Sequence, residues 1–179
     1  MTTTRRALLT SLLIALTVAA GQALAAVPNV EVVTFLVFVS GFLLGPRLGA
    51  LVGGGAMLVH SLFNVMGAAM LPVLLVQVVC YATIGLVGAI LGPMIARARN
   101  HLVGALIAAI AGAVLVLGYQ LPVNIATFYV FTNEAGLWIY IWGGLLFSAV
   151  QIVWNAGLFL VALRPTLAVL ERYRGELQQ

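Results

Sequence analysis

Long apolar stretches follow one another along the whole chain, separated by short segments that carry prolines, glycines, arginines or polar residues. An α-helix needs about 20 apolar residues to cross a hydrocarbon core about 30 Å thick, and most of the stretches approach that length. The pattern predicts an all-α integral membrane protein, a single domain over residues 1–179 built as a bundle of six transmembrane helices. We expect spans at about residues 7–26, 31–44, 48–64, 72–91, 102–119 and 137–163, with the prolines at or near their ends.

The basic residues predict the orientation of this bundle. All eight are arginines, and they precede the first span, follow the even-numbered spans, and are absent from the other loops. Cytoplasmic loops carry an excess of Lys and Arg, so we expect both termini on the cytoplasmic side of a bacterial inner (plasma) membrane. The arginines are Arg5, Arg6, Arg47, Arg97, Arg99, Arg164, Arg172 and Arg174.

Composition agrees with a membrane protein, because 64% of the residues are hydrophobic and 7% are charged. The positive net charge does not point to nucleic acid, since the arginines stand singly or in pairs at helix ends. Orientation and contact with anionic lipids explain them better. The single Cys80 leaves the redox compartment undetermined.

The first apolar stretch has a second interpretation. Arg5 and Arg6, the apolar run and the small residues Ala23-Leu24-Ala25 are also typical of a cleaved secretory signal. The length of the run favours a retained span, because signal sequences have shorter apolar regions of about 7–15 residues.

The first span also carries small residues at every fourth position. A ridge of small side chains lets two helices approach closely in lipid. In span one it serves either packing inside the bundle or docking of a partner protein, for which Ala15, Ala19 and Ala23 are the candidates. A similar series at Gly45, Gly49 and Gly53 is better explained by packing inside the bundle, and so is the one in span five.

Sequence motifs for catalysis are absent. The chain has no Asp and four Glu, and no phosphate-binding loop of the P-loop type or nucleophile motif occurs. His60 and His101 are expected at opposite membrane faces, where they cannot share a metal ion. We therefore predict a protein that is not an enzyme and has no cofactor and no metal site.

The remaining polar residues gather on the expected exterior side, mixed with aromatic residues. Polar side chains in spans are costly and usually face a cavity or the bundle interior, and an apolar pocket with a few hydrogen-bonding groups suits a small organic ligand. The segment after span five is expected to be the longest exterior loop. The candidate ligand-binding residues are Asn29, Glu31, His60, Asn64, Gln77, Tyr81, Asn124, Tyr129, Asn133 and Trp138.

Each of these candidates has a simpler explanation. Trp138 belongs equally to an aromatic belt at the membrane interface, and Glu31 to the first turn of a helix. His60 and Asn64, one turn apart, can bind neighbouring helices. The same holds for Gln151 and Asn155, which share a face of span six.

The chain resembles the substrate-binding S component of an energy-coupling factor (ECF) vitamin transporter. The similarity lies in the stretch Pro28-Asn29-Val30-Glu31-Val32-Val33-Thr34, the following Gly41-Phe42-Leu43-Leu44-Gly45 run, and the pair Ala15 and Ala19. The resemblance implies a six-helix protein that captures a vitamin on the exterior side. It implies partners as well: a transmembrane coupling subunit that docks on the alanine ridge, and two ATPase subunits.

The substrate that the resemblance suggests is cobalamin or a related precursor, with Cys80 as a metal ligand only if a corrinoid binds. Soft thiolate coordination to cobalt is chemically reasonable, but Cys80 falls within span four rather than in a loop. Two other functions remain open. A non-transporting membrane scaffold or assembly subunit would use the same ridge for a partner, and a solitary channel or facilitator would need polar residues throughout the bundle.

Overall fold

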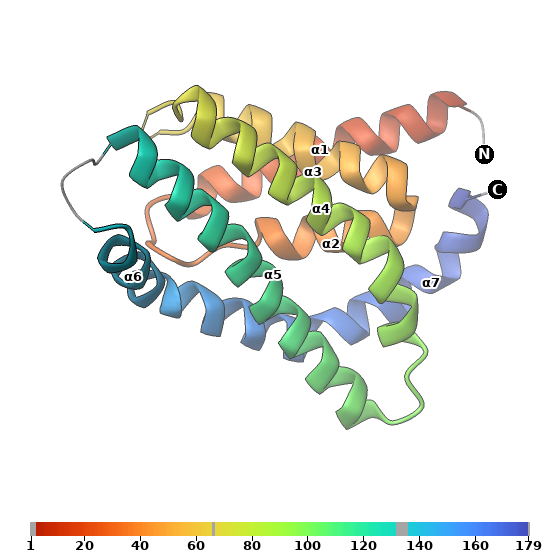
Figure 1. The fold of residues 1–179 in the computed structure, drawn as a ribbon. Coiled ribbons are helices and arrows are strands. Elements are labelled where there is room, and N and C mark those ends of the chain that lie inside the picture. Colours follow the sequence, from red (N-terminus) through yellow and green to blue (C-terminus); the bar gives the residue numbers. More distant parts are fainter. Residues whose placement is uncertain (1–2, 66, 132–135, 179) are drawn as a thin grey trace.

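The computed structural model describes residues 3–65, 67–131 and 136–178, and every regular element among them is helical. The elements are α1 (Thr3–Leu24), α2 (Val33–Leu44), α3 (Pro46–Leu62), α4 (Leu71–Ala96), α5 (His101–Phe131), α6 (Leu137–Leu158), a π-helical stretch (Phe159–Leu163) and α7 (Arg164–Gln178). Successive helical segments run up and down the bundle, and α6 continues through the π-helical stretch into α7 (Figure 1).

Four of these helical segments are long and apolar enough to cross a membrane: α1, α4, α5 and the continuous segment from α6 into α7. Their outer faces expose large apolar side chains such as Leu8, Leu146 and Val161. Continuous apolar surface of this kind is unusual on soluble proteins and suits contact with lipid. The structure is therefore compatible with a helical membrane protein, as the sequence predicts.

The helices α2 and α3 differ from the other four segments in length. They have 12 and 17 residues, so at 1.5 Å per residue they reach about 18 Å and 26 Å, short of a core about 30 Å thick. In α2, 10 of the 12 residues are buried by neighbouring helices, so this helix needs little contact with lipid. The complete crossing of all six segments and the cytoplasmic location of the termini stay predictions.

The arginine-bearing segments lie together at the end of the bundle where α1 begins and α7 finishes (Figure 1). Contacts between them confirm this grouping. Arg97 forms an ion pair of 2.7 Å with Glu171 of α7, and the Arg164 Nη2 atom donates to the Ala98 carbonyl oxygen at 2.9 Å. The Arg174 guanidinium stacks 4.8 Å from the centre of the Phe42 ring.

The helix α5 ends later than the sequence predicts for span five. It continues past residue 119 to Phe131, with Pro122 inside it, so residues 120–131 of the predicted exterior loop are instead about three further turns of helix. Proline removes the N–H that would bond the carbonyl oxygen of Gly118, four residues earlier. The Cys80 thiol lies 3.9 Å from that oxygen and donates toward it. A weak donor from α4 thus compensates the freed carbonyl, which is how prolines are tolerated within helices in lipid.

The other expected ends shift for related reasons. The helix α4 continues beyond residue 91 to Ala96 and contains Pro93 in its last turns. The expected span 137–163 extends through the π-helical stretch into α7, and Pro165 lies at the second residue of α7, directly after that stretch. Both ends of spans one to three agree with α1, α2 and α3 to within four residues.

Glycines bring the backbones of α2, α3 and α4 into direct contact. A Cβ atom added to Gly41 would lie 1.9 Å from the Gly85 carbonyl oxygen, one on Gly85 would lie 2.1 Å from the Gly49 carbonyl oxygen, and one on Gly49 would lie 2.5 Å from the Gly41 Cα atom. The three glycines therefore form a junction that no residue with a side chain can occupy. The glycines of α3 at positions 49 and 53 pack inside the bundle, as the sequence predicts.

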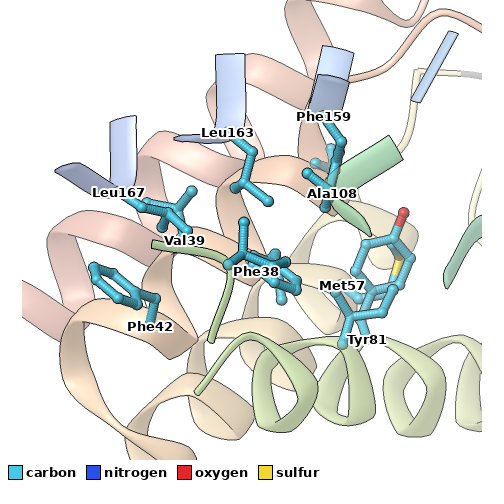
Figure 2. Packing of buried hydrophobic residues seen from close by; sticks show 13 residues of the cluster. Phe38, Val39, Phe42, Met57, Tyr81, Ala108, Phe159, Leu163 and Leu167 are labelled. Carbon is cyan, nitrogen blue, oxygen red and sulfur yellow. The ribbon is translucent and has the colours of Figure 1, made fainter. Parts of the chain in front are cut away.

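The hydrophobic core is centred on α2 and joins it to the π-helical stretch and α7. The Phe159 ring meets Phe35 and Phe38 edge-on, with ring centroids 5.6 Å and 5.4 Å apart. Leu163 and Leu167 extend the cluster toward Phe42, while Tyr81 and Met57 lie at its other end (Figure 2). The core fills the middle of the bundle and leaves its two ends for polar groups.

We expect Gly85→Ala to lower the thermal midpoint of the protein in detergent, because the added Cβ displaces the α3 backbone. Overpacking of this kind costs about 1–3 kcal/mol or more. The matched control is Gly157→Ala, since a Cβ atom there meets nothing within 4 Å. Equal midpoints for the two variants would contradict the glycine junction.

Candidate functional site

A cavity of about 440 Å³ lies between the ends of α1 and α3 and the beginnings of α2 and α4, away from the arginine-bearing end. Residues of α5 and α6 complete its wall. Its polar lining consists of Asn29, Glu31, His60, Ser61, Asn64, Gln77, Tyr81, Tyr119, Gln120 and Gln151. Six of the predicted ligand-binding residues are in this group: Asn29, Glu31, His60, Asn64, Gln77 and Tyr81.

The segment 25–32 covers one side of this cavity. Consecutive turns fold it, with the Val27 N–H donating to the Leu24 carbonyl oxygen at 2.9 Å. Asn29 has a φ of 62°, a left-handed conformation that asparagine tolerates better than most residues. Its side-chain amide donates to the Phe147 carbonyl oxygen of α6 at 3.1 Å. Asn29 therefore ties the covering segment to α6.

Glu31 connects the covering segment to both α2 and α6. Its Oε2 atom accepts the Thr34 N–H at 2.9 Å, which satisfies one of the free donors at the start of α2. Its Oε1 atom accepts the Asn155 side-chain amide at 2.7 Å, and its carbonyl oxygen accepts the Trp154 indole N–H at 2.8 Å. Glu31 therefore lies two residues before α2 rather than in its first turn, but it binds a donor at the start of this helix, and the same residue lines the cavity.

Polar side chains of α3, α4 and α5 form a connected row along the cavity wall. The Ser61 hydroxyl donates to the Gln77 Oε1 atom at 2.8 Å, and the Gln77 amide donates to the Tyr119 hydroxyl at 3.3 Å. One turn from Gln77, the buried Tyr81 hydroxyl lies 3.4 Å from the Thr34 hydroxyl. These bonds fix the orientation of the groups that a ligand would meet.

His60 lies in the last turn of α3 and Asn64 two residues beyond its end, so they do not share a helix face as predicted, but their Nε2 and Nδ2 atoms are 3.4 Å apart. The imidazole packs against Gly21 of α1, where a Cβ atom would lie 3.0 Å from the ring. The Gln22 amide also reaches the end of α3, donating to the Phe63 carbonyl oxygen at 3.0 Å. The end of α1 thus forms part of the cavity wall.

A second cavity of about 510 Å³ adjoins the first, and the two share Asn29 and Gln120 in their walls. Asn124, which the sequence predicts for the ligand site, lines this second cavity beside Gly144 of α6. It does so from inside α5 rather than from a loop.

The remaining sequence candidates lie elsewhere. Tyr129 and Trp138 are 67% and 73% exposed and line neither cavity, which suits residues at a membrane interface. Asn133 lies outside the described residues. Cys80 is part of the α4–α5 contact and is absent from the cavity lining.

Sequence reasoning missed several residues of the cavity wall. Tyr119, Gln120 and Gln151 line it, and Gln120 donates to Gln151 at 2.5 Å. Asn155, one turn from Gln151 on the same face, binds Glu31. The pairing of Gln151 with Asn155 was visible in the sequence, but nothing there showed that it faces the start of α2.

The alanines at positions 15, 19 and 23 are exposed on the outer face of α1. Nearer the beginning of the same helix, Ala7 and Ser11 line a third, largely apolar cavity of about 640 Å³ between α1 and the start of α3. Arg6 and Arg47 stand in its wall. The small-residue ridge of α1 therefore faces outward and is not consumed by packing within the chain.

Comparisons with models of protein families, with curated proteins and with solved structures found no match to this chain. The chemistry of the cavity is therefore argued from its own residues. Among the described residues, no group of three or more His, Cys, Asp or Glu side chains lies together. The cavity offers one carboxylate, one imidazole and several amide and phenol groups for hydrogen bonds.

We expect Asn155→Asp to destabilise the protein, because it replaces the donor to Glu31 by a second carboxylate. Loss of a buried hydrogen bond to a charged group costs about 1.5–3 kcal/mol. Adding Glu31→Gln should restore much of the stability, since glutamine supplies a donor to the new aspartate. Thermal midpoints of the two single variants and the double variant measure this coupling. Additive losses would show that the two side chains do not interact.

Proposed function

We propose that this protein is the substrate-binding membrane subunit of an ECF-type ABC importer. In this proposal it captures a vitamin or related micronutrient on the exterior side and delivers it inward together with a transmembrane coupling subunit and two ATPase subunits. The ligand site is the cavity between the segment 25–32, the ends of α1 and α3, and the beginning of α4.

The observation that carries the proposal is this cavity and its cover. Its volume of about 440 Å³ lies within the range of about 300–1,000 Å³ that small-molecule sites occupy. Its polar groups are already held in place by bonds within the protein, as in the row from Ser61 through Gln77 to Tyr119. Preorganised polar groups favour specific binding of a small organic molecule, because little further ordering is needed when it binds.

The outer face of α1 supports the part of the proposal that concerns a partner protein. Ala15, Ala19 and Ala23 stand at successive turns of the helix and are exposed. In lipid, a ridge of small side chains allows a second helix to approach closely and gain van der Waals contacts. The apolar cavity beside Ala7 and Ser11 continues this surface toward the arginine-bearing end.

A solitary channel or facilitator is less well supported, because the hydrophobic core closes the bundle beyond the cavity. Phe38, Phe159 and Leu163 are fully buried there and pack against one another. A scaffold without a ligand would use the α1 ridge equally well, so ligand binding is the property that separates it from the proposal.

The first test is native mass spectrometry of the protein purified from cells supplied with several vitamins. A bound small molecule is expected, and its mass identifies the substrate, cobalamin or a precursor among the possibilities. An absorption spectrum of the same sample detects a corrinoid directly. A protein that is consistently empty would favour the scaffold.

We expect Ala15→Leu and Ala19→Leu to abolish uptake by cells while ligand binding by the purified protein changes by less than about twofold, because the added bulk obstructs the partner and not the cavity. The matched control is Ala149→Leu, the same substitution at an exposed position of α6. It should preserve uptake. Loss of ligand binding in the α1 variants, or equal loss of uptake in the control, would contradict the docking role.

A further inference from the structure

The cavity of about 440 Å³ has a negatively charged side chain in its wall and, among its described lining residues, no arginine or lysine to balance it. Among the described residues that line it, Glu31 carries the only formal charge at neutral pH, and these residues include no arginine. The sequence has no lysine at all. The arginines lie at the other end of the bundle, where Arg97 pairs with Glu171 and Arg164 bonds the carbonyl oxygen of Ala98.

The bonds of Glu31 indicate an ionised carboxylate. Both of its oxygens accept hydrogen bonds, one from the Thr34 N–H and one from the Asn155 amide. An ionised carboxylate only accepts and has about four lone-pair sites, so each oxygen retains capacity for a second donor. Asn155 is fully buried and Glu31 half-buried, so the carboxylate is fixed at the edge of the cavity rather than free in solvent.

The other lining groups do not offset this charge. Gln77, Gln120 and Tyr119 are neutral and bond one another or their neighbours. Among the described lining residues, only the imidazole of His60 could become positive. This imidazole is engaged with Asn64 and packed against Gly21. A carboxylate or phosphate on a ligand would therefore meet Glu31 without an arginine or lysine to balance it. Repulsion is stronger at such a partly buried site than in water.

We infer that the cavity selects a small organic molecule that is neutral or positively charged and donates N–H groups to the Glu31 carboxylate. This inference rests on the proposed function and specifies its substrate class. Molecules of the same skeleton that carry a phosphate or carboxylate are rejected, because exclusion of an unpaired like charge is an efficient source of specificity. Nitrogen-containing heteroaromatic rings with an amino or cationic group fit these requirements.

Matched pairs of probes test this selection on the wild-type protein in detergent. Suitable pairs are thiamine with thiamine monophosphate, and nicotinamide with nicotinate. Binding can be followed by intrinsic fluorescence, because the Trp154 indole bonds the Glu31 carbonyl oxygen and so reports on the site. In any pair that binds, the member without the anionic group should bind at least about tenfold more tightly. Equal or tighter binding of the anionic member overturns the inference while leaving a ligand-binding subunit intact.

The variant Glu31→Gln should remove this preference, weakening a cationic probe about tenfold and a neutral one less. Glutamine retains an acceptor for the Thr34 N–H, and the thermal midpoint verifies folding. The matched control is Glu171→Gln, which removes a carboxylate at the opposite end of the bundle and should leave the preference unchanged. An unchanged preference in Glu31→Gln overturns the assignment to Glu31, and if this variant does not fold, the wild-type pairs decide alone.

When no probe binds, the molecule identified by mass spectrometry in the wild-type protein decides the outcome. A neutral or basic molecule supports the inference, and one with a phosphate or carboxylate overturns it. Cobalamin carries a phosphodiester, so finding it bound would support the proposed function and overturn this inference. A protein that binds no probe and carries no molecule overturns the proposed function itself, and the inference falls with it. The two failures are therefore distinguishable.

Discussion

The structure depends on the contact of three helix backbones at Gly41, Gly49 and Gly85. Helices in lipid gain little from the hydrophobic effect, so close packing and weak contacts between backbones must hold them together. At this junction the Gly85 carbonyl oxygen occupies the place that a side chain on Gly41 would need. The approach lets α3 and α4 enclose α2, which is why a helix of only 12 residues can form the centre of the bundle.

The same junction sets the geometry of the cavity. Tyr81 lies one turn before Gly85 on α4, and its carbonyl oxygen fits against Gly53 of α3, which brings the two walls to a fixed spacing. The Tyr81 hydroxyl then reaches Thr34 in the first turn of α2, next to the carboxylate of Glu31. The polar groups at the beginning of α2 are thus positioned by contacts made deeper in the bundle.

Sequence patterns predicted the helices well where hydrophobic runs were continuous, and less well where proline was used as an end signal. In lipid an unsatisfied backbone group is costly, so α5 continues through Pro122 and Cys80 compensates the freed carbonyl. The spacing of His60 and Asn64 correctly indicated that their side chains lie close together, although Asn64 lies beyond the end of α3. It could not reveal that Gln120 and Gln151 meet, because their contact depends on how α5 packs on α6.

The two ends of the bundle have opposite electrostatic character, and the core that separates them constrains how a ligand could move inward. The cavity presents Glu31, the far end presents the arginines, and Phe38, Phe159 and Leu163 fill the space between. Opening a path through these side chains would break the packing on which α2 depends, and closely packed interiors resist such deformation. On the proposed function, delivery is therefore better achieved by movement of the bundle as a unit. The outward face of α1, with its small side chains still available, is where a partner can drive that movement.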